Sequence, residues 1–156
     1  MSEVRWLSAE EEQAWRAYRR MRTRLDLQLA RDLARDSQLS ESDYDVLSTL
    51  TEQPGRTLRA SELAARLLWS TSRLAHHAGR MERRGLIARG ECEEDGRGAT
   101  LTLTDAGWAA LRAAAPAHVA SVRRHFIDLL TPSQVQCLGE VAGQVLEHFD
   151  QGERFG

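Results

Sequence analysis

Apolar residues recur every three or four positions through most of the chain, interrupted by two short stretches with the composition of strands. This spacing predicts amphipathic helices joined to a little β-structure. The clearest helix runs from Thr71 or Ser72 to about Arg84, with its apolar positions on one side at Leu74, Ala78 and Met81. We expect the stretch from residue 63 to residue 107, which contains this helix, to organise the rest of the chain.

The opposite side of this helix is polar and cationic. At 100° per residue it carries Ser72, His76, Gly79, Arg80 and Arg83, with Arg73 at its edge. Short hydroxyls at the N-terminal end suit phosphate oxygens, and long donors suit base edges. Gly79 has two readings: a site of close approach to a DNA backbone, or a tolerated glycine in a helix. His76 is a candidate base or phosphate contact, and His77 is expected to be a semi-buried packing residue.

A β-hairpin is predicted directly after this helix. Gly85 is placed to end the helix in a left-handed conformation. Residues 86–89 and 99–103 have the composition of strands, and the polar, glycine-rich residues 93–98 between them should project as a wing that carries Arg97. A third, edge strand is expected near residues 57–59. The predicted fold is therefore mainly α with a small β-hairpin wing, a winged helix-turn-helix.

Three helices are predicted before the cationic helix. Ser8 and Glu11 form a capping box that starts a long helix, and Ser40 with Asp43 starts a second one. Pro54-Gly55 stops the second helix. Ser61 is expected to open a short third helix, whose inward-facing residues are Leu63, Ala64, Leu67 and Leu68. The turn between the third and the cationic helix is Trp69-Ser70-Thr71.

Two helices are predicted after the hairpin. Thr104 caps the first, whose apolar spacing continues from Trp108 to Leu129, with a bend expected at Pro116. Thr131-Pro132-Ser133-Gln134 is a strong start for the last helix. We expect residues 1–36 and 108–150 to form a helical dimerisation region, residues 37–107 a winged helix-turn-helix DNA-binding domain, and residues 151–156 a flexible tail.

The distribution of charge changes how the formal net charge of -2 is interpreted. Residues 59–89 carry seven arginines and two acids, a balance of +5, whereas residues 1–58, 90–103 and 104–156 carry -2, -3 and -2. Positive charge is thus concentrated in the segment that contains the cationic helix, as DNA binding requires. No apolar run approaches the ~20 residues of a membrane span. We expect a cytoplasmic protein with no membrane partner.

Other kinds of chemistry have little support in the sequence. No Ser-His-Asp order, phosphate loop or HExxH motif is present, so we expect no enzyme, no catalytic residue and no cofactor. Cys92 and Cys137 stand in no zinc-binding pattern and are expected to be reduced, although a redox switch at Cys92 stays open. His118 and His125, seven residues apart, leave a metal-sensing role open, but no metal site is predicted.

Several of these motifs together resemble one family. They are Leu63-Ala64, Ser70-Thr71-Ser72-Arg73-Leu74, Met81-Glu82-Arg83-Arg84-Gly85-Leu86-Ile87, Asp95-Gly96-Arg97 and Leu101-Thr102-Leu103-Thr104-Asp105-Ala106-Gly107. In this combination the chain resembles the MarR family of bacterial transcription regulators over nearly its whole length. Four carboxylates just before Arg97 depart from what is favourable near phosphate.

The resemblance implies a homodimer that binds a palindromic operator in double-stranded DNA, and we expect a repressor. The helix from Ser70 to Arg84 would lie in the major groove, and Arg97 would enter the minor groove with Asp95 orienting it. The expected DNA-binding residues are Ser70, Thr71, Ser72, Arg73, His76, Arg80, Arg83 and Arg97.

The resemblance also implies release of DNA by a small aromatic effector that binds between the dimerisation and DNA-binding parts. The aromatic residues that could line such a site are Trp15, Tyr18, Tyr44, Trp69 and Trp108. Each of them is also explained as part of a core. The alternatives are a winged-helix protein-interaction module without DNA binding, or a regulator that senses metal or redox state.

Overall fold

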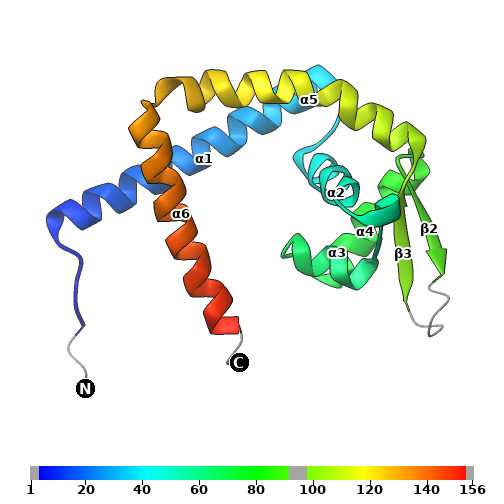
Figure 1. Ribbon diagram of the computed structural model, residues 1–156, viewed down its shortest axis with the longest axis horizontal. Helices are drawn as coiled ribbons and strands as arrows, with labels where there is room; N and C mark the ends of the chain where they lie inside the picture. Colours follow the sequence, from blue (N-terminus) through cyan, green and yellow to red (C-terminus); the bar gives the residue numbers. More distant parts are fainter. Residues whose placement is uncertain (1–3, 92–97, 154–156) are drawn as a thin grey trace. The chain divides into compact units, whose positions relative to one another are not determined.

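The computed structural model describes residues 4–91 and 98–153 (Figure 1). The chain divides into two compact units. The first, here called the winged unit, is Asp26–His118, and the second, the helical unit, combines Met1–Leu25 with Val119–Gly156. The division falls inside two long helices, α1 (Ala9–Ser37) and α5 (Asp105–His125).

The winged unit packs three short helices against a small sheet. The helices are α2 (Glu41–Thr51), α3 (Ala60–Arg66) and α4 (Thr71–Arg83), and Figure 1 draws them beside the β2–β3 hairpin. The strands β1 (Thr57–Arg59), β2 (Ile87–Glu91) and β3 (Ala99–Leu103) are antiparallel, in the order β1-β3-β2. The winged helix-turn-helix with its third, edge strand is thereby confirmed.

The core of the winged unit is built from the apolar positions that the helical and alternating patterns select. Val46, Leu47 and Leu50 of α2 are fully buried, and Leu101 and Leu103 supply the inward side of β3. The other large side chains with less than 2% exposure are Leu63, Leu74, Met81 and Ile87. Burial of each such side chain contributes about 1.5–3 kcal/mol, so this core dominates the stability of the unit.

Three helix starts are fixed by reciprocal side-chain and backbone hydrogen bonds. The Ser8 amide donates to Glu11 while the Glu11 amide donates to the Ser8 hydroxyl. Ser40 and Asp43 make the same pair of bonds at α2. Thr131 and Gln134 make it at α6 (Pro132–Glu153), where proline occupies the first position. These are the capping boxes that the sequence predicts.

The junction between α4 and α5 depends on two glycines. Gly85 has a φ of 72°, so it ends α4 in the left-handed conformation that the sequence predicts. Gly107, in the first turn of α5, lies so close to β2 that an added Cβ would be 2.0 Å from the Leu86 carbonyl oxygen. The Thr104 hydroxyl donates toward the Gly85 and Leu86 carbonyls and accepts from the Gly107 amide. The start of α5 is thus bonded directly to the end of the α4 turn.

Two details of α3 differ from the prediction. The helix begins at Ala60, and its N-cap residue is Arg59, whose side chain makes no capping hydrogen bond. Ser61 therefore lies inside the helix instead of opening it. Leu68, expected to face inward, is 86% exposed. Its φ of 54° turns the chain out of the helical period directly after α3, so its side chain leaves the apolar face.

The ends of the last two long helices also differ. α5 stops at His125, and a short 3-10 turn, η2 (Ile127–Leu129), follows a Phe126 with φ of -143°. The predicted helical run to Leu129 was therefore wrong, and Leu129 is 73% exposed. α6 continues to Glu153, three residues into the segment expected to be a flexible tail. Residues 154–156 lie outside the described part of the chain.

The helical unit leaves its apolar residues in solvent within a single chain. From α1, Trp15, Tyr18 and Met21 are 42–51% exposed. From α6, the residues 36–62% exposed include Leu138, Val141, Val145, Leu146 and Phe149. Several exposed apolar residues on one helix are uncommon on a monomeric protein.

The contact at Gly107 predicts a large loss of stability in Gly107→Ala. A methyl group there must displace the Leu86 backbone and the Leu103 side chain, so we expect the free energy of unfolding to fall by about 3 kcal/mol. Urea denaturation followed by circular dichroism would measure this loss.

The matched control is Gly79→Ala, where the nearest atom to an added Cβ is the end of the Arg83 side chain at 3.8 Å. That variant should gain about 1 kcal/mol from the higher helix propensity of alanine. Equal stability of the two variants would contradict the close approach at Gly107.

Candidate nucleic-acid interface

The recognition face predicted on α4 is exposed in the structure. Leu74, Ala78 and Met81 are at most 1% exposed and fasten the helix to the core. The residues on the exposed side are Thr71, Ser72, Arg73, His76, Arg80 and Arg83, and Gly79 between them is half-buried. The two-sided character of this helix is thereby confirmed, although no contact with DNA is tested by the structure.

The N-terminal end of α4 combines a hydroxyl cap with unpaired backbone amides. Ser70 accepts from the Arg73 amide at 3.1 Å, and its hydroxyl lies 3.3 Å from that of Ser72. The guanidinium of Arg73 lies over the Trp69 ring, 4.2 Å from its centroid. The first amides of a helix and its positive dipole end attract anions, so this end suits a phosphate group.

The arginines in α4 and directly after it fall into two groups. Arg84 donates to Asp43 at 2.7 Å, and Arg89 lies 3.7 Å from Glu82. Arg73, Arg80 and Arg83 form no ion pair with an acid in the part of the chain that the structure describes. The cations of the α4 face therefore keep their charge available for another molecule.

His77 is more deeply buried than the sequence suggests and is not a simple packing residue. Only 8% of it is exposed, and both ring nitrogens have a polar neighbour. Nδ1 lies 2.8 Å from a guanidinium nitrogen of Arg80, and Nε2 lies 3.0 Å from the Asp43 carboxylate. Trp69 meets the same ring edge-on, with centroids 5.5 Å apart.

Electrostatics keep His77 neutral and Asp43 charged. Burial lowers the pKa of His77, the Asp43 carboxylate opposes this, and Arg80 and Arg73 lower it further. Burial alone would raise the pKa of Asp43, but hydrogen bonds from Arg84 and Ser40 outweigh it and hold the pKa below its ordinary value. Sequence reasoning gave Asp43 only the role of a helix cap and gave Arg84 no role.

The wing residues Arg97 and Asp95, like Cys92, lie outside the described residues. The hairpin that carries them is described up to the pairing of Glu91 with Ala99. Its register runs from this pair to Ile87 opposite Leu103. The predicted hairpin is confirmed, and the roles of Arg97 and Asp95 stay predictions.

The five aromatic residues considered for an effector site have different neighbours. Trp15 and Tyr18 stack on each other in the helical unit, with centroids 5.8 Å apart. In the winged unit, Tyr44 packs on His118 at 4.5 Å, and Trp69 packs on His77. Trp108 is covered by the guanidinium of Arg56 at 4.4 Å. Guanidinium groups thus already occupy a face of Trp69 and of Trp108.

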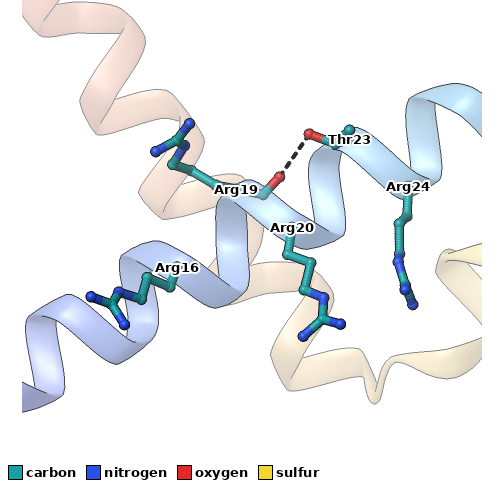
Figure 2. A pocket seen from close by; sticks show the side chains of 5 residues that line it. All are labelled: Arg16, Arg19, Arg20, Thr23 and Arg24. Carbon is teal, nitrogen blue, oxygen red and sulfur yellow. Dashed lines mark hydrogen bonds between the residues drawn. The ribbon is translucent and has the colours of Figure 1, made fainter.

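A second group of arginines follows one side of α1. A surface depression of about 410 Å³ is lined by Arg16, Arg19, Arg20, Thr23 and Arg24, and Figure 2 shows that all five come from this single helix. Thr23 donates to the Arg19 carbonyl, and Arg16 pairs with Glu12. This is a solvated helix face with an ion pair, as the sequence indicates, and it has no opposing wall from another element among its lining residues.

The described residues were also compared with the other sites considered. Within residues 4–91 and 98–153, no three His, Cys, Asp or Glu side chains gather closely enough to hold a metal ion. Cys137 is a free, exposed thiol. Across the same residues, no helix is both long and apolar enough to cross a membrane.

Comparison with known proteins identifies the family. The model of the MarR family matches residues 37–98. The structure of AbsC, a MarR family transcriptional regulator from Streptomyces coelicolor, is 40% identical and has a TM-score of 0.88 over 95% of this chain and 99% of that one. Sco3205, a MarR family regulator from the same organism solved in complex with DNA, is 42% identical, with a TM-score of 0.89 over 95% and 92% of the two chains.

A curated relative from Escherichia coli K12, the transcriptional repressor MprA, is 30% identical over 118 residues, which span 76% of this chain and 66% of MprA. Members of this family regulate transcription and are not enzymes, as the sequence analysis expects. Sequence identity of 40% across nearly two whole chains, together with the matching fold, assigns the protein: it belongs to the MarR family of transcriptional regulators.

Proposed function

We propose that this regulator represses transcription by binding, as a homodimer, a palindromic operator whose major groove receives α4. The observation that carries this proposal is the exposed α4 face, on which Arg73, Arg80 and Arg83 have no acidic partner among the described residues. Two relatives support it. Sco3205 was solved in complex with DNA, and MprA is named a transcriptional repressor.

The residues of α4 divide into two roles in this proposal. Ser70, Thr71 and Ser72 at the helix start would bind a phosphate, together with the first backbone amides. Ser70 already accepts a hydrogen bond as the helix cap, so its hydroxyl hydrogen is the part that it offers. His76 and Arg80, farther along the exposed side, would contact base edges.

Arg73 and Arg83 flank this reading pair. Arg73 is held over Trp69, and Arg83 is in the last turn of α4. At these positions we propose phosphate contacts for both. We propose that Arg97, in the loop between β2 and β3, enters the neighbouring minor groove and that Asp95 orients it. A dimer would then cover half-sites about one helical turn, ~10 bp, apart.

Two arginine variants should separate base reading from charge attraction. Arg80→Ala should relax sequence preference at one base pair of each half-site, at a cost of about 1–3 kcal/mol. Arg97→Ala should weaken binding to all sequences and reduce the salt dependence by about one phosphate contact. The measurement is fluorescence anisotropy in a salt titration, on an operator selected from a random DNA pool.

The control for these variants is Arg123→Ala, which removes an arginine that pairs with Asp128 outside α4 and the wing. It should bind like the wild type. If selection enriches no palindromic sequence, the protein is an interaction module. If Arg97→Ala keeps the wild-type salt dependence, the wing has a different role.

We propose that the partner of the exposed apolar stripe is a second copy of the chain. The stripe includes Trp15 and Tyr18 of α1 and Val145 and Phe149 of α6, each 45–61% exposed in one chain. A symmetric dimer buries the same patch on both subunits and would present two copies of α4 to the two operator halves.

Phe149→Glu should dissociate this dimer, because a carboxylate would be buried without a partner at the interface. Sedimentation equilibrium should give twice the 17.5 kDa chain mass for the wild type and a shift toward a single chain for the variant. Gln144→Glu adds the same charge to a polar, exposed position of α6 and should stay dimeric. A wild-type protein that sediments as a single chain would contradict the proposal.

We also propose a small aromatic effector that releases the operator. Among the five aromatic candidates, the rings of Trp15, Tyr18 and Tyr44 have no guanidinium carbon within 4.4 Å of their centroids. A phenol that binds the folded protein should raise its melting temperature by mass action. At the same concentration it should weaken operator binding. A panel of phenols tested by thermal shift, with none changing the melting temperature, would contradict this proposal.

A further inference from the structure

A series of buried polar side chains, here called the polar series, lies directly behind Arg80. Arg80 is exposed, but one of its guanidinium nitrogens is 2.8 Å from Nδ1 of His77, which is three residues earlier on α4. The other ring nitrogen of His77 is 3.0 Å from Oδ1 of Asp43 on α2. The polar series Arg80, His77 and Asp43 therefore connects the exposed face of α4 to α2 through the interior.

The direction of each hydrogen bond follows from the groups involved. A guanidinium has five N–H donors and no acceptor, so Nδ1 of His77 has to accept from Arg80. The hydrogen of the neutral ring is then on Nε2, which faces the Asp43 carboxylate. Nδ1 can accept from Arg80 only while His77 is neutral, because an imidazolium carries a hydrogen on both nitrogens.

Asp43 is held in place at the inner end of the polar series. It is 3% exposed, and its Oδ2 accepts from the Ser40 amide at 3.0 Å and from Arg84 at 2.7 Å. Arg84 also donates to the carbonyl of Gln38. The carboxylate is thus held by groups before α2 and after α4, and its remaining oxygen orients the His77 ring.

We propose that His77 is a positioning residue for sequence readout: it holds one N–H group of Arg80 on Nδ1 and leaves the other four for base edges. This inference rests on the proposed function, in which Arg80 reads a base pair. An arginine held at one nitrogen loses less rotational freedom on binding DNA than one that moves freely in solvent. Correct and incorrect base pairs should therefore differ more in affinity when His77 accepts from Arg80.

Protonation of His77 should remove this support, because an imidazolium has no acceptor and repels Arg80. The charged groups that act on the ring are Asp43 from α2 and Arg80 and Arg73 from α4, and Arg84 after α4 pairs with the same Asp43. Burial and the two α4 arginines lower the pKa of His77 below its ordinary value of 6.5, against the effect of Asp43. Discrimination between operator variants should thus be constant above pH 6.5 and fall at lower pH.

Two substitutions divide the functions of the ring. The side-chain oxygen of asparagine reaches the place of Nδ1, so His77→Asn keeps an acceptor for Arg80 and leaves Asp43 without its partner. The amide nitrogen of glutamine reaches the place of Nε2, so His77→Gln keeps the donor to Asp43 and removes the acceptor at Nδ1. Neither side chain titrates, and both leave His76 in place as an internal control.

The experiment compares affinity for the selected operator with affinity for the operator changed at the base pair that Arg80→Ala affects. His77→Gln should lose discrimination by about tenfold at every pH, as Arg80→Ala does. His77→Asn should discriminate like the wild type at pH 7.5 and stay constant as the pH falls below 6.5, whereas the wild type should lose discrimination as His77 becomes protonated. Adding His77→Gln to Arg80→Ala should cause no further loss.

Melting temperatures separate positioning from folding. His77→Asn should be the less stable variant, because the buried Asp43 loses a partner, and yet it should be the more specific one. If both variants lose specificity in proportion to stability, or if His77→Gln discriminates like the wild type, the inference is wrong. A wild-type profile that does not change as His77 becomes protonated also overturns it, and this measurement needs no variant to fold.

The failure of the proposed function has a different signature. If Arg80→Ala leaves the sequence preference unchanged, Arg80 does not read bases, and the base contact and its support by His77 are both rejected. If Arg80→Ala relaxes the preference and His77→Gln does not, only the positioning role is rejected.

Discussion

The burial of one side of α4 is the constraint from which the rest of the winged unit follows. Leu74, Ala78 and Met81 are removed from solvent almost completely and meet the apolar faces of α2, α3 and the sheet. Because these three positions fix the rotation of the helix about its axis, they also decide which residues face outward. The exposed arginines are a consequence of where the apolar side chains had to go.

Local signals in the sequence were sufficient for most of the fold. Capping boxes, the left-handed glycine and the helical periods depend on residues close in the chain, so Ser40, Thr131 and Gly85 have the roles predicted for them. Leu68 shows the limit of such reasoning. Leu68 continues the apolar period in the sequence, but its positive φ turns the chain so that its side chain leaves the apolar face.

The candidate site could be predicted only on its outer surface. Which residues of α4 face solvent follows from a period of 3.6 and is confirmed. The supports beneath them were missed, because Asp43 reaches His77, and Arg84 reaches Asp43, through tertiary packing and not through any spacing along the chain. Because capping already explains Asp43, the sequence gives no sign that this residue has a second partner. An aspartate in a first turn and a histidine on the flank of a buried face are each explained locally.

The close approach at Gly107 has a mechanical consequence for regulation. Thr104 and Gly107 join the first turn of α5 to the carbonyls of Gly85 and Leu86, immediately after the recognition helix, with no side chain between the backbones to absorb a displacement. The first turn of α5 is therefore joined to the end of α4 by backbone contacts and not through a layer of side chains. A displacement of the first turn of α5 therefore has a short route to the end of α4.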